Sequence, residues 1–267
     1  MKVEARVLAK KEHALGCVAL SAVASLLIVG CARAPMKAGK IRIACIGDSI
    51  TWGYAMTNRV AECYPAQMQR LLGDAYDVRN FGDPGSGVYL NPQREPNGWA
   101  SHPWSRGEQA RAAHAFAPDV VVCNLGINDM HTHQCELKCG TDVCTAVERG
   151  RFRREYIDLL MAFEHDGRLP RFIIWTKLGP LGRLHRNYGS CAPFLMRGDL
   201  EAVAREVQAE TLDLYEPLLP LVETRHFAPD GIHPEGLAQG VIAEITADAI
   251  LGLLTKGRSG SWLNMGK

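Results

Sequence analysis

The stretch Ile41–Ser49, which reads IRIACIGDS, decides the fold of this chain of 267 residues. Residues 41–46 form a short, mostly apolar run, which is typical of a strand buried in an α/β sheet. The run passes directly into Gly47, which allows a sharp exit from the strand, and then into Asp48 and Ser49. A serine at the mouth of a strand is a candidate nucleophile. The same triplet is also typical of a strand-to-helix turn in which the serine caps the helix.

A second segment, DGIHP at residues 230–234, lies far along the chain. His233 follows Asp230 by three residues, so the histidine is a candidate base and the aspartate a candidate carboxylate that orients it. Together with Ser49, they could fill the three roles of an acyl-transfer triad: nucleophile, proton acceptor and orienting carboxylate. The chain order Ser, Asp, His is not decisive, because triads recur in several orders.

Two further motifs follow predicted strands and could complete such a site, because sites of open α/β sheets form outside the carboxyl ends of the strands. The glycine-rich turn at residues 80–87 (NFGDPGSG) could present a bare backbone N–H to a developing negative charge. Residues 126–129 (GIND) follow the next predicted strand, and the carboxamide of Asn128 could donate to an oxyanion. The alternatives are a simple turn for the first motif and an Asx-turn for the second.

The rest of the sequence alternates short apolar runs with longer amphipathic stretches, which is typical of an α/β domain with a largely parallel sheet. We expect strands at residues 41–46, 77–80, 120–124, 171–175 and 212–214. We expect helices at residues 64–72, 108–115, 152–164, 200–210 and 235–254. Two long connections, 85–107 and 178–198, are candidate substrate-binding loops.

Residues 1–30 have the pattern of a signal peptide: a basic start, then an uncharged and mostly apolar run that is short for a membrane span. The run ends at Cys31, a position that resembles the lipidation site of bacterial lipoproteins, and an uncleaved signal anchor is the alternative. We therefore expect a lipoprotein signal peptide (1–30), a tether (31–40), one domain (41–256) and a flexible tail (257–267). Such a protein would be held in the bacterial cell envelope by the lipid on Cys31.

Nine cysteines are many for a cytosolic enzyme and fit an exported one. The unusual group is Cys135, Cys139, Cys144 and Cys191. His131 and His133 lie just upstream, so zinc is conceivable by residue type, but the spacing lacks the paired CxxC knuckles of structural zinc sites. We therefore expect disulfides in this group and no metal. Cys45 and Cys123 lie in apolar strand patterns and are expected to be buried free thiols.

The net charge and the size of the chain limit the classes of function. A formal net charge of +1, without a basic stripe, gives no electrostatic footprint for binding nucleic acid. The chain has an ordinary apolar content and is long enough to form one domain with a substantial core.

Taken together and in this order, the four motifs resemble those of the SGNH hydrolase superfamily, the GDSL-type esterases and lipases, over residues 41–254. The resemblance implies a flavodoxin-like, three-layer α/β/α fold with a parallel sheet of strand order 2-1-3-4-5. It also implies that Ser49 is the nucleophile, that His233 is the base and that Asp230 is its partner. The lack of a GxSxG elbow argues against an α/β-hydrolase.

The resemblance further implies an oxyanion hole made by the backbone N–H groups of Ser49 and Gly85 and by the side chain of Asn128. Gly82 and Gly87 lie close enough in the sequence to take the place of Gly85. No metal and no cofactor is implied.

The residues that flank the motifs resemble those of the carbohydrate-directed branch of the superfamily, which includes sialate O-acetylesterase-like and acetylxylan-esterase-like proteins. This implies hydrolysis of small acyl esters, mainly O-acetyl esters, on a glycan through an acyl-enzyme. A lipase, lysophospholipase or thioesterase is the alternative on the same fold, and a non-catalytic, lipid-anchored glycan-binding protein is the alternative of another class. The candidate substrate contacts are Asp48, Trp52, Asp129 and Trp104, and Tyr54 is a further aromatic that a sugar could pack against.

Overall fold

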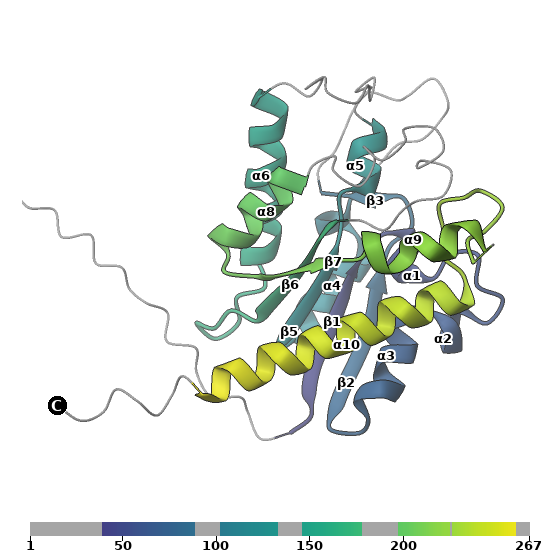
Figure 1. Ribbon diagram of the computed structural model, residues 1–267. Helices are drawn as coiled ribbons and strands as arrows, with labels where there is room; N and C mark the ends of the chain where they lie inside the picture. Colours follow the sequence, from purple (N-terminus) through teal and green to yellow (C-terminus); the bar gives the residue numbers. More distant parts are fainter. Residues whose placement is uncertain (1–38, 89–101, 133–145, 178–196, 225, 260–267) are drawn as a thin grey trace, which may run out of the picture. The chain divides into compact units, whose positions relative to one another are not determined.

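The computed structural model describes residues 39–88, 102–132, 146–177, 197–224 and 226–259. Within these residues, a five-stranded parallel sheet has the order β2-β1-β5-β6-β7 (Figure 1). Its strands are β1 (Ile41–Gly47), β2 (Tyr76–Gly82), β5 (Val120–Asn124), β6 (Arg171–Lys177) and β7 (Glu210–Asp213). Numbered along the chain, they lie in the order 2-1-3-4-5, so the predicted fold class and topology are confirmed. A separate two-stranded sheet consists of β3 (Ser86–Gly87) and β4 (His102–Pro103).

Along the chain, the helices lie between the strands, except the last two, which follow the last strand, β7. Those that precede β5 are α1 (Ser49–Trp52), α2 (Arg59–Glu62), α3 (Tyr64–Leu72), the 3-10 helix η1 (Trp104–Arg106) and α4 (Glu108–Phe116). Those that follow it are α5 (Ile127–Thr132), α6 (Ala146–Met161), α8 (Arg197–Glu206), α9 (Tyr215–Glu223) and α10 (Gly236–Ser259).

The two faces of the sheet carry separate apolar clusters, because alternate residues of a strand point to opposite faces. Ile43 and Cys45 of β1 join a cluster that includes buried residues of α3, α9 and α10. Ala44 and Ile46 join a second cluster, with buried residues of α4, α6 and α8. The sheet therefore lies between two helical layers, and Figure 1 shows α10 crossing one face beside α3.

The predicted helices and strands are accurate where the apolar pattern is regular. The helix at residues 64–72 and the strand at residues 120–124 are confirmed to the residue. No predicted helix corresponds to α9, because two of its nine residues are prolines, which obscure a helical pattern. The helix predicted at residues 200–210 is wrong at its end, since Glu210 begins β7, and α10 continues beyond the predicted end at Leu254.

By length and composition alone, residues 236–256 of α10 could cross a membrane, and no other helix in the described part of the chain could. The helix is nevertheless part of the core. Ala243, Ala247 and Ile250 are buried in the cluster that contains Ile43 of β1. Packing on the sheet therefore explains much of its apolar surface.

Several predicted features lie outside the described residues. They are the signal peptide, the tether from Cys31 to residue 38, residues 89–101 and 178–196 of the long connections, residues 260–267 of the tail, and the cysteines Cys135, Cys139, Cys144 and Cys191. Cys45 and Cys123 are described, and both are buried free thiols as predicted.

Candidate active site

Ser49 is the first residue of α1 and lies where β1 ends. The turn between the two elements is tight: a Cβ on Gly47 would lie only 2.2 Å from Thr51 Oγ1, so glycine is required there. Asp48 caps α1, because its Oδ1 accepts a hydrogen bond from the Ile50 amide at 2.9 Å. The residue that caps the helix is therefore the aspartate and not the serine, whose hydroxyl remains available for chemistry.

His233 and Asp230 lie in the loop between α9 and α10. His233 Nε2 is 2.8 Å from Ser49 Oγ, and His233 Nδ1 is 2.6 Å from Asp230 Oδ2. The other carboxylate oxygen, Oδ1, accepts hydrogen bonds from the amides of Ile232 and His233 at 2.8 and 3.1 Å. The loop thus orients the carboxylate, and the structure joins the three side chains of the predicted triad in one hydrogen-bonded chain.

The electrostatic environment of these three hydrogen-bonded side chains suits proton transfer. Partial burial acts to raise the pKa of Asp230, but the hydrogen bonds from the Ile232 amide and from His233 outweigh it, so the pKa of Asp230 is lowered. A carboxylate that is charged at neutral pH favours the His233 tautomer with its proton on Nδ1, which leaves Nε2 to accept a proton. The half-exposed ring of Tyr54 packs against the His233 ring, with centroids 4.5 Å apart.

Three glycines at and after the end of β2 are candidates for an oxyanion donor, and their surroundings differ. The Gly82 amide donates to Asn80 Oδ1 at 2.9 Å. Gly87 lies against Asp129, since a Cβ on Gly87 would be 2.8 Å from Asp129 Oδ1. Gly85 has a φ of +82°, and its amide has no backbone acceptor among the described residues. The amide of Gly82 is therefore occupied by Asn80, whereas the amide of Gly85 is not engaged by the described backbone and Gly85 remains the predicted oxyanion donor.

Asn128 lies near the start of α5, directly after β5, and is buried. Its Nδ2 donates to the Ser86 carbonyl at 2.8 Å, which leaves the second N–H of the carboxamide for another acceptor. The turn after β2 is held beside β1, because the Asp83 amide and the Ser86 hydroxyl both donate to the Gly47 carbonyl, at 2.9 and 3.4 Å. The candidate oxyanion donors thus follow three adjacent strands, β2, β1 and β5.

The two tryptophans predicted as substrate contacts occupy different positions. Trp104 is fully buried, and its Nε1 donates to the Phe81 carbonyl at 2.9 Å. It is a core side chain, and this position gives no support to the predicted contact with a sugar. Trp52 is partly exposed, but the Arg59 guanidinium lies 4.2 Å from the centre of its ring.

Asp48 and Asp129, the other predicted substrate contacts, are fully buried. Burial raises the pKa of each carboxyl to about 7, although the Ile50 amide opposes this at Asp48 and the Val88 amide opposes it at Asp129. Both oxygens of Asp129 accept from the Val88 amide, at 2.9 and 3.0 Å. Both aspartates therefore hold turns of the site. Across the described ranges, no group of three or more His, Cys, Asp or Glu side chains is placed to hold a metal ion.

Two buried amides near the site have no counterpart among the predicted residues. Asn124 ends β5 beside Gly47, and neither polar atom of its side chain has a hydrogen-bond partner within the described part of the chain. Gln239 of α10 is fully buried between α1, α3 and the loop that contains His233, here called the histidine loop. A single amide in a strand or a helix gives no signal in the sequence.

A serine, a histidine and an aspartate joined by hydrogen bonds, beside N–H groups that can bind an oxyanion, have the composition of a serine hydrolase site. The chain belongs to the GDSL-like Lipase/Acylhydrolase family, whose model matches residues 45–239. The predicted family is thereby confirmed.

Three known proteins are similar to this chain over most of its length. An acetylxylan esterase of Xylanibacter ruminicola is 43% identical over 231 residues, which cover 80% of this chain and 44% of the relative, so the chain spans less than half of that protein. The structure resembles a carbohydrate acetylesterase, Est24, from Sinorhizobium meliloti with a TM-score of 0.53 and 18% identity, over 80% of this chain and 100% of the other. It also resembles an acetyl-xylooligosaccharide esterase from Geobacillus, with a TM-score of 0.53 and 21% identity, over 80% and 96% of the two chains. At these identities, the structural likeness concerns the fold.

Proposed function

We propose that this chain is a serine esterase that removes small acyl groups, principally O-acetyl groups, from a carbohydrate. The observation that carries the proposal is the hydrogen-bonded chain from Ser49 Oγ through His233 to Asp230, with distances of 2.8 and 2.6 Å. Membership of the acylhydrolase family supports the reaction class, and the acetylxylan esterase relative supports the acetyl group and the sugar.

In the proposed reaction, Ser49 Oγ attacks the ester carbonyl carbon while His233 Nε2 accepts its proton, and Asp230 stabilises the imidazolium that forms. The oxyanion accepts hydrogen bonds from the amides of Ser49 and Gly85 and from the second N–H of Asn128, and one such donor contributes on the order of 10²–10³ in kcat. When the intermediate collapses, the sugar oxygen leaves with the proton from His233. A water molecule then gives a proton to His233 and attacks the acyl carbonyl carbon. As the bond to Ser49 Oγ breaks, His233 returns this proton to Ser49 Oγ, which releases the acid, as acetate and a proton in neutral solution, and restores the free enzyme.

Acetylated xylan is the first glycan to test, because the Xylanibacter relative is named for it. An O-acetylated sialic acid is the second, because the motifs also resemble sialate O-acetylesterase-like proteins. The half-exposed ring of Tyr54, which packs on His233, supports a carbohydrate substrate, because a sugar can pack its apolar face on an aromatic ring beside the nucleophile.

The dependence of the rate on acyl length tests the proposal against the lipase alternative. We expect kcat/KM for p-nitrophenyl esters to be highest for acetate and to fall steeply by butyrate or hexanoate, with acetate released from acetylated xylan. A lipase gains roughly 0.8 kcal/mol for each methylene that it buries, so its kcat/KM would rise with acyl length. A preference for octanoyl or longer esters would contradict the deacetylase. Binding of the glycan without turnover of any ester would instead support a glycan-binding protein.

We further propose that the mature chain is exported and begins at a lipidated Cys31, with disulfides among Cys135, Cys139, Cys144 and Cys191. The basic and apolar pattern of residues 1–30 and the position of Cys31 support the first part, and the cysteine content of an exported chain supports the second. Mass spectrometry of the purified chain, with and without reduction, measures both features. An unmodified N-terminal region with free thiols at all four positions would contradict them.

A further inference from the structure

Gln239 is a fully buried side chain that contacts three separate segments around the candidate active site. Its Oε1 accepts a hydrogen bond from the Tyr64 amide, at the start of α3, at 2.8 Å. Its Nε2 donates to the carbonyl of Ile50 in α1 at 3.3 Å and to the carbonyl of Pro234 at 3.2 Å. One carboxamide therefore connects α10 with α3, with the nucleophile helix and with the histidine loop.

The three partners require a carboxamide at this position. The Tyr64 amide can only donate and the two carbonyls can only accept, so a group with one acceptor and two donors satisfies all of them. α3 has no side-chain cap of its own, and its first amides would otherwise lack intrahelical partners. An apolar residue would leave buried backbone groups unpaired, and a carboxylate would face two carbonyl oxygens.

The two carbonyls belong to the neighbours of the reacting residues. Ile50 directly follows Ser49, and Pro234 directly follows His233. Ser49 and His233 are 184 positions apart in the sequence, α1 has only four residues, and so short a helix does not hold its own position. We propose that Gln239 is a positioning residue, whose carboxamide sets the separation between the Ser49 turn and the His233 loop. This proposal rests on the proposed serine esterase mechanism.

A small error in this separation matters for the reaction. The contact between Ser49 Oγ and His233 Nε2 is 2.8 Å, and a hydrogen bond is largely lost when its heavy atoms move apart by about 1 Å. Misplacement of reacting groups by about 1 Å can lower a rate by about 10²-fold. Loss of the carboxamide should therefore lower kcat more than it affects the binding of a small ester.

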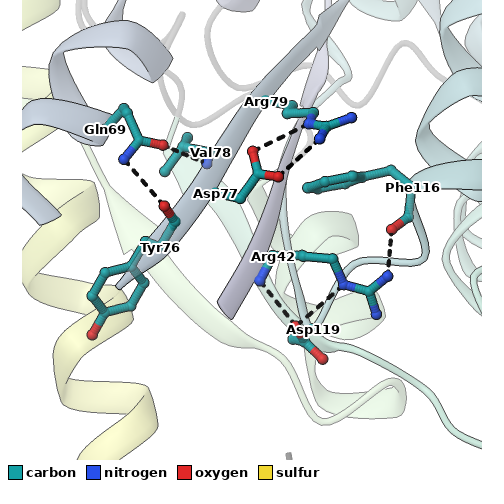
Figure 2. A network of polar contacts seen from close by, with 8 residues as sticks. All are labelled: Arg42, Gln69, Tyr76, Asp77, Val78, Arg79, Phe116 and Asp119. Atoms are coloured by element: carbon teal, nitrogen blue, oxygen red, sulfur yellow. Dashed lines mark hydrogen bonds and ion pairs between the residues drawn. The ribbon is translucent and has the colours of Figure 1, made fainter. Parts of the chain in front are cut away.

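A second glutamine provides a matched control, because it makes the same set of hydrogen bonds at the amino ends of the strands, away from the candidate active site. Gln69 of α3 donates through Nε2 to the carbonyls of Gly73 and Tyr76, at 3.0 and 3.2 Å, and accepts from the Val78 amide at 2.8 Å. In Figure 2, Gln69 is shown in contact with Tyr76 and Val78. Its partners lie in the turn before β2 and in the first residues of that strand. Replacement of Gln69 thus removes an equivalent set of hydrogen bonds from a place where no chemistry is expected.

The main experiment compares Gln239→Met with Gln69→Met in the full-length protein, because methionine keeps the length of the side chain without its hydrogen bonds. Measurements are kcat and KM for p-nitrophenyl acetate, the rate at which a fluorophosphonate labels Ser49, and unfolding in urea. For Gln239→Met, we expect kcat and the labelling rate to fall about 10- to 100-fold, with KM changed less than about threefold. For Gln69→Met, we expect both rates to stay within about twofold of the wild type, although its resistance to urea decreases as well. Equal rate losses in the two variants, or a folded Gln239→Met with wild-type kcat, would overturn the proposal.

Glutamate variants at the two positions keep the test decisive if Gln239→Met does not fold. The protonated carboxyl of Gln239→Glu can still donate one hydrogen bond, whereas the ionised form cannot donate any. We expect the kcat of Gln239→Glu, divided by that of the wild type at the same pH, to fall at least about tenfold between about pH 5 and about pH 9. His233, Asp230 and the Tyr64 hydroxyl are present in both proteins, so the ratio reports what the substitution changes. A ratio that does not change with pH, as we expect for Gln69→Glu, would contradict the role of Gln239.

The labelling rates separate this proposal from the proposed function. A wild-type protein that is labelled at Ser49 but does not hydrolyse acetyl esters would contradict the deacetylase. The labelling rates of the glutamine variants would still decide the role of Gln239. A wild-type protein labelled at another serine, with Ser49 unmodified, would overturn both.

Discussion

The strands of the central sheet carry the same kinds of polar side chain at their amino ends, here called the amino edge, and at their carboxyl ends, here called the carboxyl edge. The two edges use these side chains in different ways. At the amino edge (Figure 2), Asp119 Oδ2 accepts a hydrogen bond from the Arg42 amide at 2.9 Å and lies 3.6 Å from Arg42 Nε. The Arg42 guanidinium also donates to the Phe116 carbonyl at 2.8 Å. Nearby, Asp77 and Arg79 form an ion pair through two hydrogen bonds of 3.1 and 2.9 Å. These charged groups are partly exposed, and each carboxylate drawn has a basic partner.

The polar groups at the carboxyl edge are buried more deeply and are satisfied less completely. Among the residues that the structure describes, five buried side-chain atoms have no hydrogen-bond partner, and three of these belong to Asp48 and Asn124. Asp48 and Asp129 are fully buried, and burial raises the pKa of each to about 7. A buried polar group without a partner costs about 1–3 kcal/mol, so this edge lowers the stability of the fold.

The difference shows which edge is arranged for chemistry. The amino edge follows the rules that stabilise any protein, whereas the carboxyl edge departs from them beside Ser49 and Asn128, as is expected of a functional site. The same sheet can carry both arrangements because the apolar clusters on its two faces supply the stability that the carboxyl edge lowers. The comparison therefore predicts that the carboxyl edge holds the residues needed for activity together with buried groups that lower stability, and that substitutions at the amino edge lower stability alone.

The largest expected effect is that of Ser49→Ala. We expect kcat/KM for acetyl esters to fall at least about 10³-fold, because the nucleophile is lost, while the free energy of unfolding stays within about 0.5 kcal/mol of the wild type. Ester hydrolysis and urea denaturation measure the two quantities, and the exposed Ser105 provides the control variant Ser105→Ala. If Ser49→Ala kept its activity, the carboxyl edge would lose its assigned role.

Much of the fold could be predicted because its signals are local. The strand at residues 120–124 begins with four apolar residues, and all five of its residues are buried. The helix at residues 64–72 has a regular pattern that ends at a glycine. The serine, asparagine, aspartate and histidine of the candidate site could be proposed from the sequence because each follows a strand or lies in a short motif. Such signals do not reach across the fold, which is why the two prolines of α9 obscured a helix that tertiary packing stabilises.

The rest of the site could not be predicted because it depends on which distant segments meet. Gln239 is one polar residue in a long apolar helix, and its role follows from its contacts with Ile50 and Pro234. Because Asp48 and Asp129 are charged, the sequence predicts that they are exposed and contact the substrate, yet both are buried in the folded chain. Trp104 has the kind of aromatic side chain on which a sugar can pack, but it is fully buried in the core.

The next expected effect concerns stability at the carboxyl edge, which Asp48→Asn measures. Burial, reinforced by the charge of Asp129, raises the pKa of Asp48 from 3.8 to about 7, so between about pH 4 and pH 7 the folded chain holds a proton that the unfolded chain releases. The contribution of this carboxyl to stability is therefore complete below about pH 4 and is lost as the pH rises through about 7.

The neutral asparagine keeps an acceptor for the Ile50 amide and does not have to ionise. We therefore expect the free energy of unfolding of Asp48→Asn, relative to the wild type, to increase on the order of 1–4 kcal/mol between about pH 4.5 and about pH 8.5. Urea denaturation at a series of pH values measures this difference. A difference that is the same at every pH would show that burial does not raise the pKa of Asp48, and the contrast between the two edges would weaken.

The smallest expected effect is that of Asp119→Ala at the amino edge. The substitution removes the acceptor of the Arg42 amide, while the guanidinium keeps its bond to the Phe116 carbonyl. We expect the free energy of unfolding to fall by about 1–2 kcal/mol, as for other hydrogen bonds to charged groups, and kcat to stay within about twofold. Asp119→Asn, which keeps one acceptor oxygen, should lose less stability than Asp119→Ala. A loss of kcat in Asp119→Ala under conditions where the variant is fully folded would mean that the two edges are coupled, and the amino edge could then no longer be regarded as purely structural.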